Sequence, residues 1–236
     1  YLGWVARERG EYEGGEAALE RSRALLAQLA DPWERSEVML PLTGATTEAE
    51  VLTAREVLSL KRELGDAIAT SDSLNNVGWE DLHAGEVDRA IVSLEEALAI
   101  ARDLEDRFRI TLALCNLGLA AVLQNRCVEA VESLRDALVI AIRSSDVRCG
   151  SEAVLGLAAA EAGLGEDEAS VKLDAVRRKI MSDAGIVYDA WMLELLEPYL
   201  SQARTRLGPE RIAELEAAVD APTLELALDL LDESHL

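Results

Sequence analysis

Aromatic residues and prolines are scarce in this sequence, and their scarcity narrows the fold. Only 4% of the 236 residues are aromatic and five are proline, whereas 50% are hydrophobic, so Ala and Leu must fill most of the core. Sheets favour aromatic and β-branched residues, whereas Ala and Leu are among the best helix formers. The composition therefore predicts an all-α protein.

Positive charge is scarce as well. The sequence has 23 Lys and Arg against 45 Asp and Glu, which gives a formal net charge of −22. Such a charge repels a phosphate backbone and anionic membrane surfaces. No uninterrupted apolar run reaches the roughly 20 residues that span a bilayer. We therefore expect no direct nucleic-acid binding and no membrane association.

Cysteine and histidine are too few to build a metal site or a disulfide framework. Cys115, Cys127 and Cys149 fit no paired metal spacing, and any disulfide would leave one of them over, which favours the reducing cytoplasm. His83 and His235 are the only histidines, and neither has partners at metal-ligand spacing. From the absence of an initiator Met or a signal sequence at Tyr1, we expect a piece of a longer chain.

Motifs of catalysis and nucleotide binding are missing too. The segment 163–165 reads Gly-Leu-Gly but lacks the Lys and the preceding strand of a phosphate-binding loop. Acidic runs such as Glu95-Glu96 are typical of solvated helix faces and helix starts. The sequence therefore predicts no catalytic residue, no cofactor and no metal ion.

What the sequence does contain is an internal repeat. Residues 59–66, 99–106 and 139–146 recur at a spacing of 40, and each reads as a helix end followed by an Asp that caps the next helix. Between these segments an apolar stripe at helical spacing is reproduced position for position. The stripe is Ala90, Ile91, Leu94, Ala97, Leu98 and Ala101, and then Ala130, Val131, Leu134, Ala137, Leu138 and Ala141.

Another helix is predicted ahead of each stripe, over residues 71–84 and 110–124. Each carries a glycine at the same place, Gly78 and Gly118. Because glycine inside a helix costs roughly 1 kcal/mol, its recurrence indicates that a neighbouring helix packs directly on the backbone there. Gly85 and Asn125 follow these helices and suit the left-handed conformation of a helix end.

These residues resemble the tetratricopeptide repeat (TPR). The pattern of a small residue, a turn residue, Ala, an apolar residue and Ala appears twice, as Gly78, Gly85, Ala90, Leu94 and Ala97, and as Gly118, Asn125, Ala130, Leu134 and Ala137. The resemblance implies a right-handed α-α superhelix of about five TPR-like hairpins. The units lie near residues 1–30, 32–65, 66–105, 106–145 and 146–183, and residues 184–236 form a C-terminal helical cap.

The outer units fit the pattern less closely. The first fits through Gly3, Gly10, Tyr12, Gly15 and Leu19, and the second contains Pro41 and Gly44, which predict a bend or a short helix. The unit 146–183 fits through Gly156, Gly163, Ala169, Leu173 and Val176 if one residue is inserted near Gly165. The period of 40 exceeds the usual 34, so helices about one turn longer are expected.

The C-terminal part, over about residues 65–233, is similar to the carboxyl end of large bacterial regulators. It carries an Ala-Gly turn at 184–185, a helix ending in Leu207-Gly208 and a final helix around 224–228. Members of that group combine a signal-transducing NTPase module with a LuxR-type or winged DNA-binding domain or a nucleotide-cyclase domain. The resemblance implies that this chain is the sensory or autoinhibitory part, with nucleotide and DNA sites elsewhere.

In TPR superhelices the first helices of successive hairpins line the concave face. Carried over, this places a candidate groove on the first helices at Asn75, Asn76, Trp79, His83, Asn116, Leu119 and Leu123. An amide both donates to and accepts from a peptide backbone, and Trp offers a large apolar contact. The structural alternatives are that Asn76 and Asn116 cap backbone groups within the stack and that Trp79 belongs to the core.

The leading hypothesis is a non-enzymatic interaction and regulatory domain. Its partner would be a protein, a peptide, another domain of the parent chain or a small effector. A free-standing adaptor that bridges partner proteins is the second hypothesis, and an enzyme on a helical scaffold is a distant third. Self-association stays open, since the edge near Tyr1 could expose an apolar face.

Overall fold

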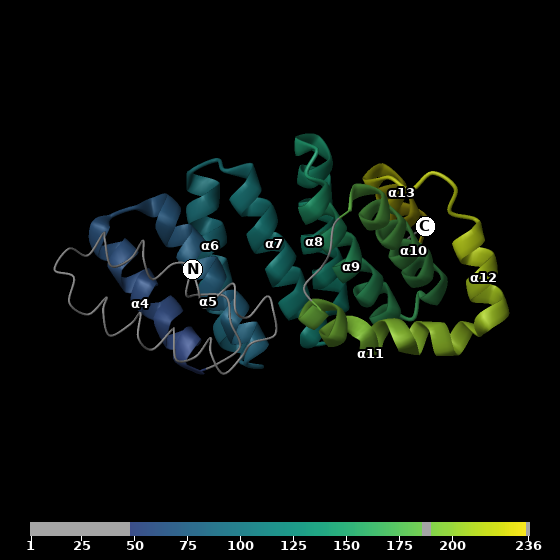
Figure 1. Ribbon diagram of the computed structural model, residues 1–236, viewed down its shortest axis with the longest axis horizontal. Coiled ribbons are helices and arrows are strands. Elements are labelled where there is room, and N and C mark those ends of the chain that lie inside the picture. The colour runs from purple at the N-terminus through teal and green to yellow at the C-terminus, as the bar shows by residue number, and fades with distance from the viewer. Residues whose placement is uncertain (1–47, 186–189, 235–236) are drawn as a thin grey trace. The chain divides into compact units, whose positions relative to one another are not determined.

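The computed structural model describes residues 48–185 and 190–234, with side chains from Ala54 to Gly185 and from Met192 onward (Figure 1). Helices and the turns between them make up this part of the chain, so the predicted all-α class is confirmed. The helices are α4 (Glu48–Leu64), α5 (Ala67–His83), α6 (Val87–Asp103), α7 (Arg107–Leu123), α8 (Cys127–Ser144), α9 (Val147–Leu164), α10 (Asp167–Ala184), α11 (Ala190–Leu207), α12 (Pro209–Ala217) and α13 (Leu224–Ser234).

Some of the sequence predictions concern residues that the structure does not describe. Three of them lie outside the described residues. These are the first repeat unit, with Gly3, Gly10, Tyr12, Gly15 and Leu19; the bend at Pro41 and Gly44; and His235. Within the described helices, none has an apolar stretch long enough to cross a bilayer. The chain divides into two compact units, residues 1–105 and 106–236, and each is described by itself.

A strict repeat governs the backbone from α4 to α10. Left-handed residues occur at positions 65, 85, 105, 125, 145, 165 and 185, which is one every twenty residues. Each follows a helix of 17 or 18 residues and reverses the chain into the next. The predicted period of 40 is therefore two helices and two turns, and the predicted left-handed conformation of Gly85 and Asn125 is confirmed.

The carboxyl ends of these helices are satisfied locally. At the turn after α5, the amide of Glu86 donates to the carbonyl of Asp81 at 2.8 Å, and the same bond joins Arg126 to Ala121 at 2.9 Å. This is the hydrogen bond of a Schellman motif, which satisfies carbonyls that the helix itself leaves open.

The first helix of each hairpin begins with an aspartate cap, as predicted. The carboxylates of Asp66, Asp106 and Asp146 accept from backbone amides three residues on, at 3.0, 3.1 and 3.0 Å. The second helices α6, α8 and α10 have no side-chain cap bond. The recurring Asp therefore marks the start of each hairpin.

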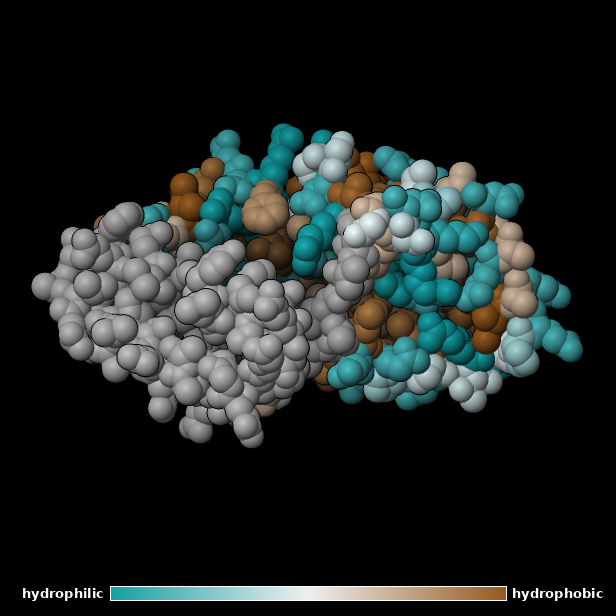
Figure 2. All heavy atoms as spheres, in the orientation of Figure 1, coloured by the Kyte–Doolittle hydropathy of each residue, from teal (hydrophilic) through white to brown (hydrophobic). Residues whose placement is uncertain are grey.

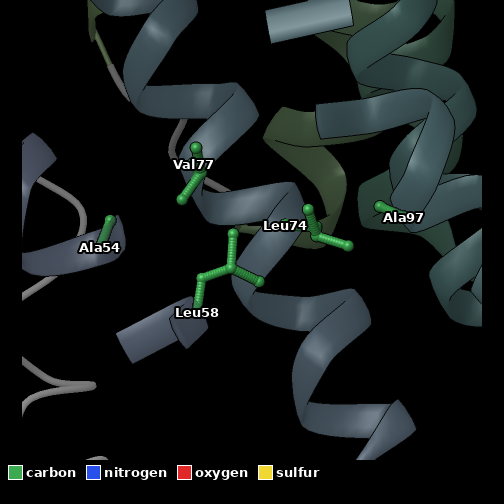
Figure 3. Packing of buried hydrophobic residues seen from close by; sticks show 5 residues of the cluster. All are labelled: Ala54, Leu58, Leu74, Val77 and Ala97. Carbon is green, nitrogen blue, oxygen red and sulfur yellow. The ribbon is translucent and has the colours of Figure 1, made fainter. Parts of the chain in front are cut away.

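In the first unit, α5 is packed between α4 and α6. Leu74 points toward Ala97 of α6, whereas Ala54 and Leu58 of α4 lie on the other side of α5 (Figure 3). Polar bonds reinforce the same sandwich. The hydroxyl of Ser71 donates to the Ala97 carbonyl at 3.1 Å.

The recurring glycines let leucines pack on the helix backbone, as predicted. A Cβ atom at Gly78 would lie 2.5 Å from Cγ of Leu94, and one at Gly118 would lie 2.3 Å from Cγ of Leu134. Gly156 of α9 approaches the same Leu134 side chain, so this leucine is held between two glycines of neighbouring helices. Close approach of this kind requires the absence of a side chain.

One sequence prediction about the unit 146–183 is wrong. The turn residue is Gly165, at φ +88°, whereas Gly163 lies inside α9, where an added Cβ would meet Sγ of Cys127 at 2.4 Å. No residue is inserted, because the left-handed positions 145, 165 and 185 keep the spacing of twenty. What changes is the buried face of α10, since Asp174 stands where the earlier repeats have Leu94 and Leu134. A helix presents another face by rotating about its axis, without any change in length.

After Gly185 the helices change direction and enclose α10. Helix α11 includes Pro198 and packs on α9 and α10, α12 packs on α10, and α13 packs on α8, α9 and α10. Gly208 and Pro209 start α12, and the hydroxyl of Thr223 accepts from the amide of Leu226 at 3.1 Å and so caps α13. Figure 1 shows α11 running across the lower ends of α9 and α10.

Candidate binding surface

Three of the predicted groove residues share one partly exposed face of α5. Asn76, Trp79 and His83 follow each other at spacings of three and four, so they lie along one side of the helix, and all three are half-buried. The rings of Trp79 and His83 meet edge to face with centroids 5.1 Å apart. This arrangement is a favourable one for aromatic rings and holds the indole in place. Asn75 belongs to the buried side, with 8% of its surface exposed.

The opposite side of α5 fixes this face. Asp81, which is almost fully buried, accepts two hydrogen bonds from the guanidinium of Arg55 on α4, at 2.7 and 2.8 Å. Arg89 at the start of α6 lies 3.4 Å from the same carboxylate. One carboxylate therefore ties α5 to both neighbouring helices, and a bidentate pair of this kind sets orientation as well as energy. A rigid helix with an aromatic and an amide on its accessible side is a suitable base for a binding site.

In the second unit, α7 carries the equivalent residues forty positions later. Asn116 and Leu119 are buried, with 5% and 4% of their surface exposed, whereas Leu123 is half-buried. Of these three residues, Leu123 therefore offers surface to a partner. The role of all seven residues in a groove stays a prediction.

Sequence reasoning missed a buried charged cluster in the second unit. The carboxylate of Asp174 accepts hydrogen bonds from Arg177 at 2.6 Å, from Arg178 at 3.1 Å and from Arg204 of α11 at 2.6 Å. Burial by itself raises the pKa of Asp174, but the three guanidinium groups outweigh it, and the pKa lies below its usual value. The sequence did contain one sign of this cluster, because Asp174 stands at the position where the two earlier repeats have Leu94 and Leu134.

More arginine pairs attach the last helices to the repeats. Arg206 of α11 binds Asp167 and the carbonyl of Ala162, and Arg211 of α12 binds Glu168. Figure 2 shows hydrophilic side chains between hydrophobic patches over α10 to α12, where several of these pairs lie. The cluster and its neighbours hold these helices together.

The cysteines pack as core residues. Sγ of Cys115 donates to the carbonyl of Cys149 at 3.7 Å, between α7 and α9. Burial raises the pKa of the Cys115 thiol well above its usual value and that of Cys149 to about 12. A thiol so hard to ionise is a poor nucleophile and a poor metal ligand. Within residues 48–185 and 190–234, no three His, Cys, Asp or Glu side chains converge as a metal site.

Comparison with known proteins supports this architecture. No protein-family model matches the chain, and no curated protein matches it. Among solved structures, the crystal structure of the apo form of RapI, a TPR-like helical-repeat protein, is similar with a TM-score of 0.65 at 16% identity. The likeness covers 99% of this chain and 92% of RapI.

At this identity the likeness establishes the fold alone. Together with the twenty-residue spacing of the turns, it shows that this chain is an all-α helical-repeat protein of the TPR-like kind. The predicted resemblance to TPR proteins is thereby confirmed at the level of the fold.

Proposed function

We propose that this chain is a non-enzymatic interaction and regulatory domain that binds a protein or peptide through the exposed face of α5. The observation that carries the proposal is the row of Asn76, Trp79 and His83, half-buried on a helix whose other side is fixed by Asp81. Trp is among the residues that contribute most to protein interfaces. An amide beside it is able to pair with both polar groups of an extended backbone.

The wider role follows from the resemblance at the carboxyl end. We infer that the chain is the sensory or autoinhibitory part of a larger bacterial transcriptional regulator in the cytoplasm, which acts in signal transduction. Its partner is then a protein, a peptide or another domain of the same parent chain, and a small effector is a further candidate ligand. A free-standing adaptor is the alternative, and the genomic reading frame upstream of Tyr1 separates the two.

Peptide display tests the binding face directly. Random peptides of about twelve residues are selected on the full chain and then assayed on Trp79→Ala and Asn76→Ala. We expect a set of peptides whose affinity falls about tenfold or more on Trp79→Ala, because the indole supplies the largest apolar contact of this face. Val92→Ala is the matched control, since Val92 is 67% exposed on the neighbouring helix α6.

Two results would contradict the proposal. The binding face is wrong if every selected peptide binds Trp79→Ala and the control equally well. The non-enzymatic assignment is wrong if the purified chain hydrolyses ATP and an independently purified variant outside the binding face, such as Val92→Ala, hydrolyses it as well.

A further inference from the structure

Two arginines in the second unit stand apart from the rest. The guanidinium groups of Arg107 and Arg143 are exposed and make no ion pair or hydrogen bond with the described residues. Every other arginine in the described part of this unit pairs with a carboxylate. Those are Arg109, Arg126, Arg135, Arg148, Arg177, Arg178, Arg204, Arg206 and Arg211. In a chain of net charge −22, uncompensated cations are the exception.

Exposed apolar side chains accompany these arginines. Phe108, the only phenylalanine of the sequence, is 54% exposed and directly follows Arg107. Val147, at the start of α9, is 38% exposed and is followed by Arg148. Single exposed apolar residues need no explanation, but a large aromatic beside unpaired arginines has the composition of an interface centre.

The topology brings these residues to one end of the unit. Helices α7, α8 and α9 run in alternating directions and pack against one another in all three pairs. Because they have 17, 18 and 18 residues, the start of α7, the end of α8 and the start of α9 are level, as Figure 1 shows at the top of these helices. Neighbouring helix axes lie about 8–10 Å apart. We call Arg107, Phe108, Arg143, Val147 and Arg148 the α7–α9 edge.

Three acidic groups of the second unit at this end are already engaged. Asp106 caps α7 and forms an ion pair with Arg109 at 2.6 Å, and Asp146 accepts from the amide of Cys149 at 3.0 Å. Glu152 lies 3.5 Å from Arg148, and burial raises the pKa of its carboxyl. The guanidinium groups of Arg107 and Arg143 therefore place positive charge near Phe108, with Glu105 the exposed carboxylate nearest to Arg107 in the sequence.

We propose that the α7–α9 edge is a second docking surface, which binds an acidic segment of a partner protein that also carries an apolar side chain. Guanidinium groups bind carboxylates in a bidentate geometry, and Arg and aromatic residues supply much of the energy of protein interfaces. Phe108 and Val147 supply the apolar contact of this edge. The net charge of −22 opposes an extended polyanion such as nucleic acid, so a short acidic segment is the better fit.

The test compares a double charge reversal at the α7–α9 edge with a single charge reversal outside it. Random peptides of about twelve residues are selected on the full chain and assayed on the double variant Arg107→Glu/Arg143→Glu and on Phe108→Ser. Arg102→Glu serves as the control, because Arg102 is an exposed arginine of the other unit and its guanidinium pairs with none of the described residues. Circular dichroism confirms that each variant keeps its helix content. A fluorescent single-stranded oligonucleotide is titrated in parallel.

We expect a set of peptides rich in Asp, Glu and apolar residues whose affinity falls about tenfold or more on the double variant and on Phe108→Ser. The same peptides should bind Arg102→Glu within about twofold of the unchanged chain. The proposal fails if no selected peptide depends on the double variant, if the dependent peptides are not acidic, or if Arg102→Glu weakens them equally. It also fails if the oligonucleotide binds more tightly than the peptides through the same two arginines. Peptides of the α5 face depend on Trp79 and not on Arg107, so the two proposals stand or fall separately.

Discussion

Substitution of Gly118 by alanine tests the packing that defines the repeat. The new methyl group would lie 2.3, 2.7 and 3.0 Å from Cγ, Cδ2 and Cδ1 of Leu134, and the first two distances are closer than carbon atoms tolerate. Leu134 is 1% exposed and is also approached by Gly156, so it has little room to move aside. Overpacking a core costs about 1–3 kcal/mol, whereas alanine in place of glycine stabilises a helix by about 1 kcal/mol. Since the contact involves Cγ and not only the end of the side chain, we expect a net loss of about 1–2 kcal/mol.

The sign of this effect should reverse when the leucine is shortened. In Leu134→Ala the three clashing atoms are gone, so Gly118→Ala should then stabilise the protein by about 1 kcal/mol through helix propensity alone. The free energy of unfolding is measured by urea denaturation for both single variants and the double variant. The coupling energy should be about 2–3 kcal/mol, at the upper end for residues in contact.

Leu138→Ala is the control for this cycle. Leu138 is buried on α8 like Leu134, but none of its atoms is among the three nearest to a Cβ added at Gly118. Gly118→Ala should therefore stay destabilising in the Leu138→Ala background. The reasoning is refuted if Gly118→Ala stabilises the unchanged chain, or if it has the same sign and size in the Leu134→Ala background.

Two further predictions concern the turn residues and the buried charges. Ser145 has φ +56°, so Ser145→Gly should raise the free energy of unfolding by about 0.5–1 kcal/mol, and a lower midpoint in thermal denaturation would contradict it. Asp174→Asn leaves the arginines around it without their counter-charge and should cost about 3–5 kcal/mol in urea denaturation at neutral pH. Because the pKa of Asp174 is depressed in the folded state, the stability that it supplies is present above the usual value of 3.8 and is lost as the pH falls below it. The loss of stability on acidification should therefore be smaller in Asp174→Asn than in the unchanged chain, and equal losses would contradict this.

The repeat was predictable because its signals are local. Aspartate caps, turn residues and an apolar stripe at period 3.6 each depend on neighbours within a few positions, and Asp106, Asn125 and Leu134 take the places that these patterns indicate. The prediction that Gly163 is a turn residue was wrong. In a sequence, a glycine that makes room for a neighbouring thiol cannot be told apart from a glycine that reverses the chain. Only the contact with Cys127 distinguishes the two.

The site was less predictable because burial depends on the whole stack. Asn76 and Asn116 occupy equivalent places in the repeat, yet the first is half-buried and the second has 5% of its surface exposed. The periodicity of the sequence assigns both to the same face of their helices, but it does not contain the neighbours that cover one of them. The Asp174 cluster was missed for a similar reason, since Arg204 lies thirty residues away on another helix.

Hydrogen–deuterium exchange of the full chain tests the central claim, that the face of α5 with Asn76, Trp79 and His83 is the principal binding surface. Exchange is followed with and without a selected peptide whose binding depends on Trp79. The account predicts that the peptide slows exchange most strongly over residues 67–83 and that Trp79→Ala abolishes this protection. Protection confined to the exposed side of α6, around Val92, with none over residues 67–83, would contradict it.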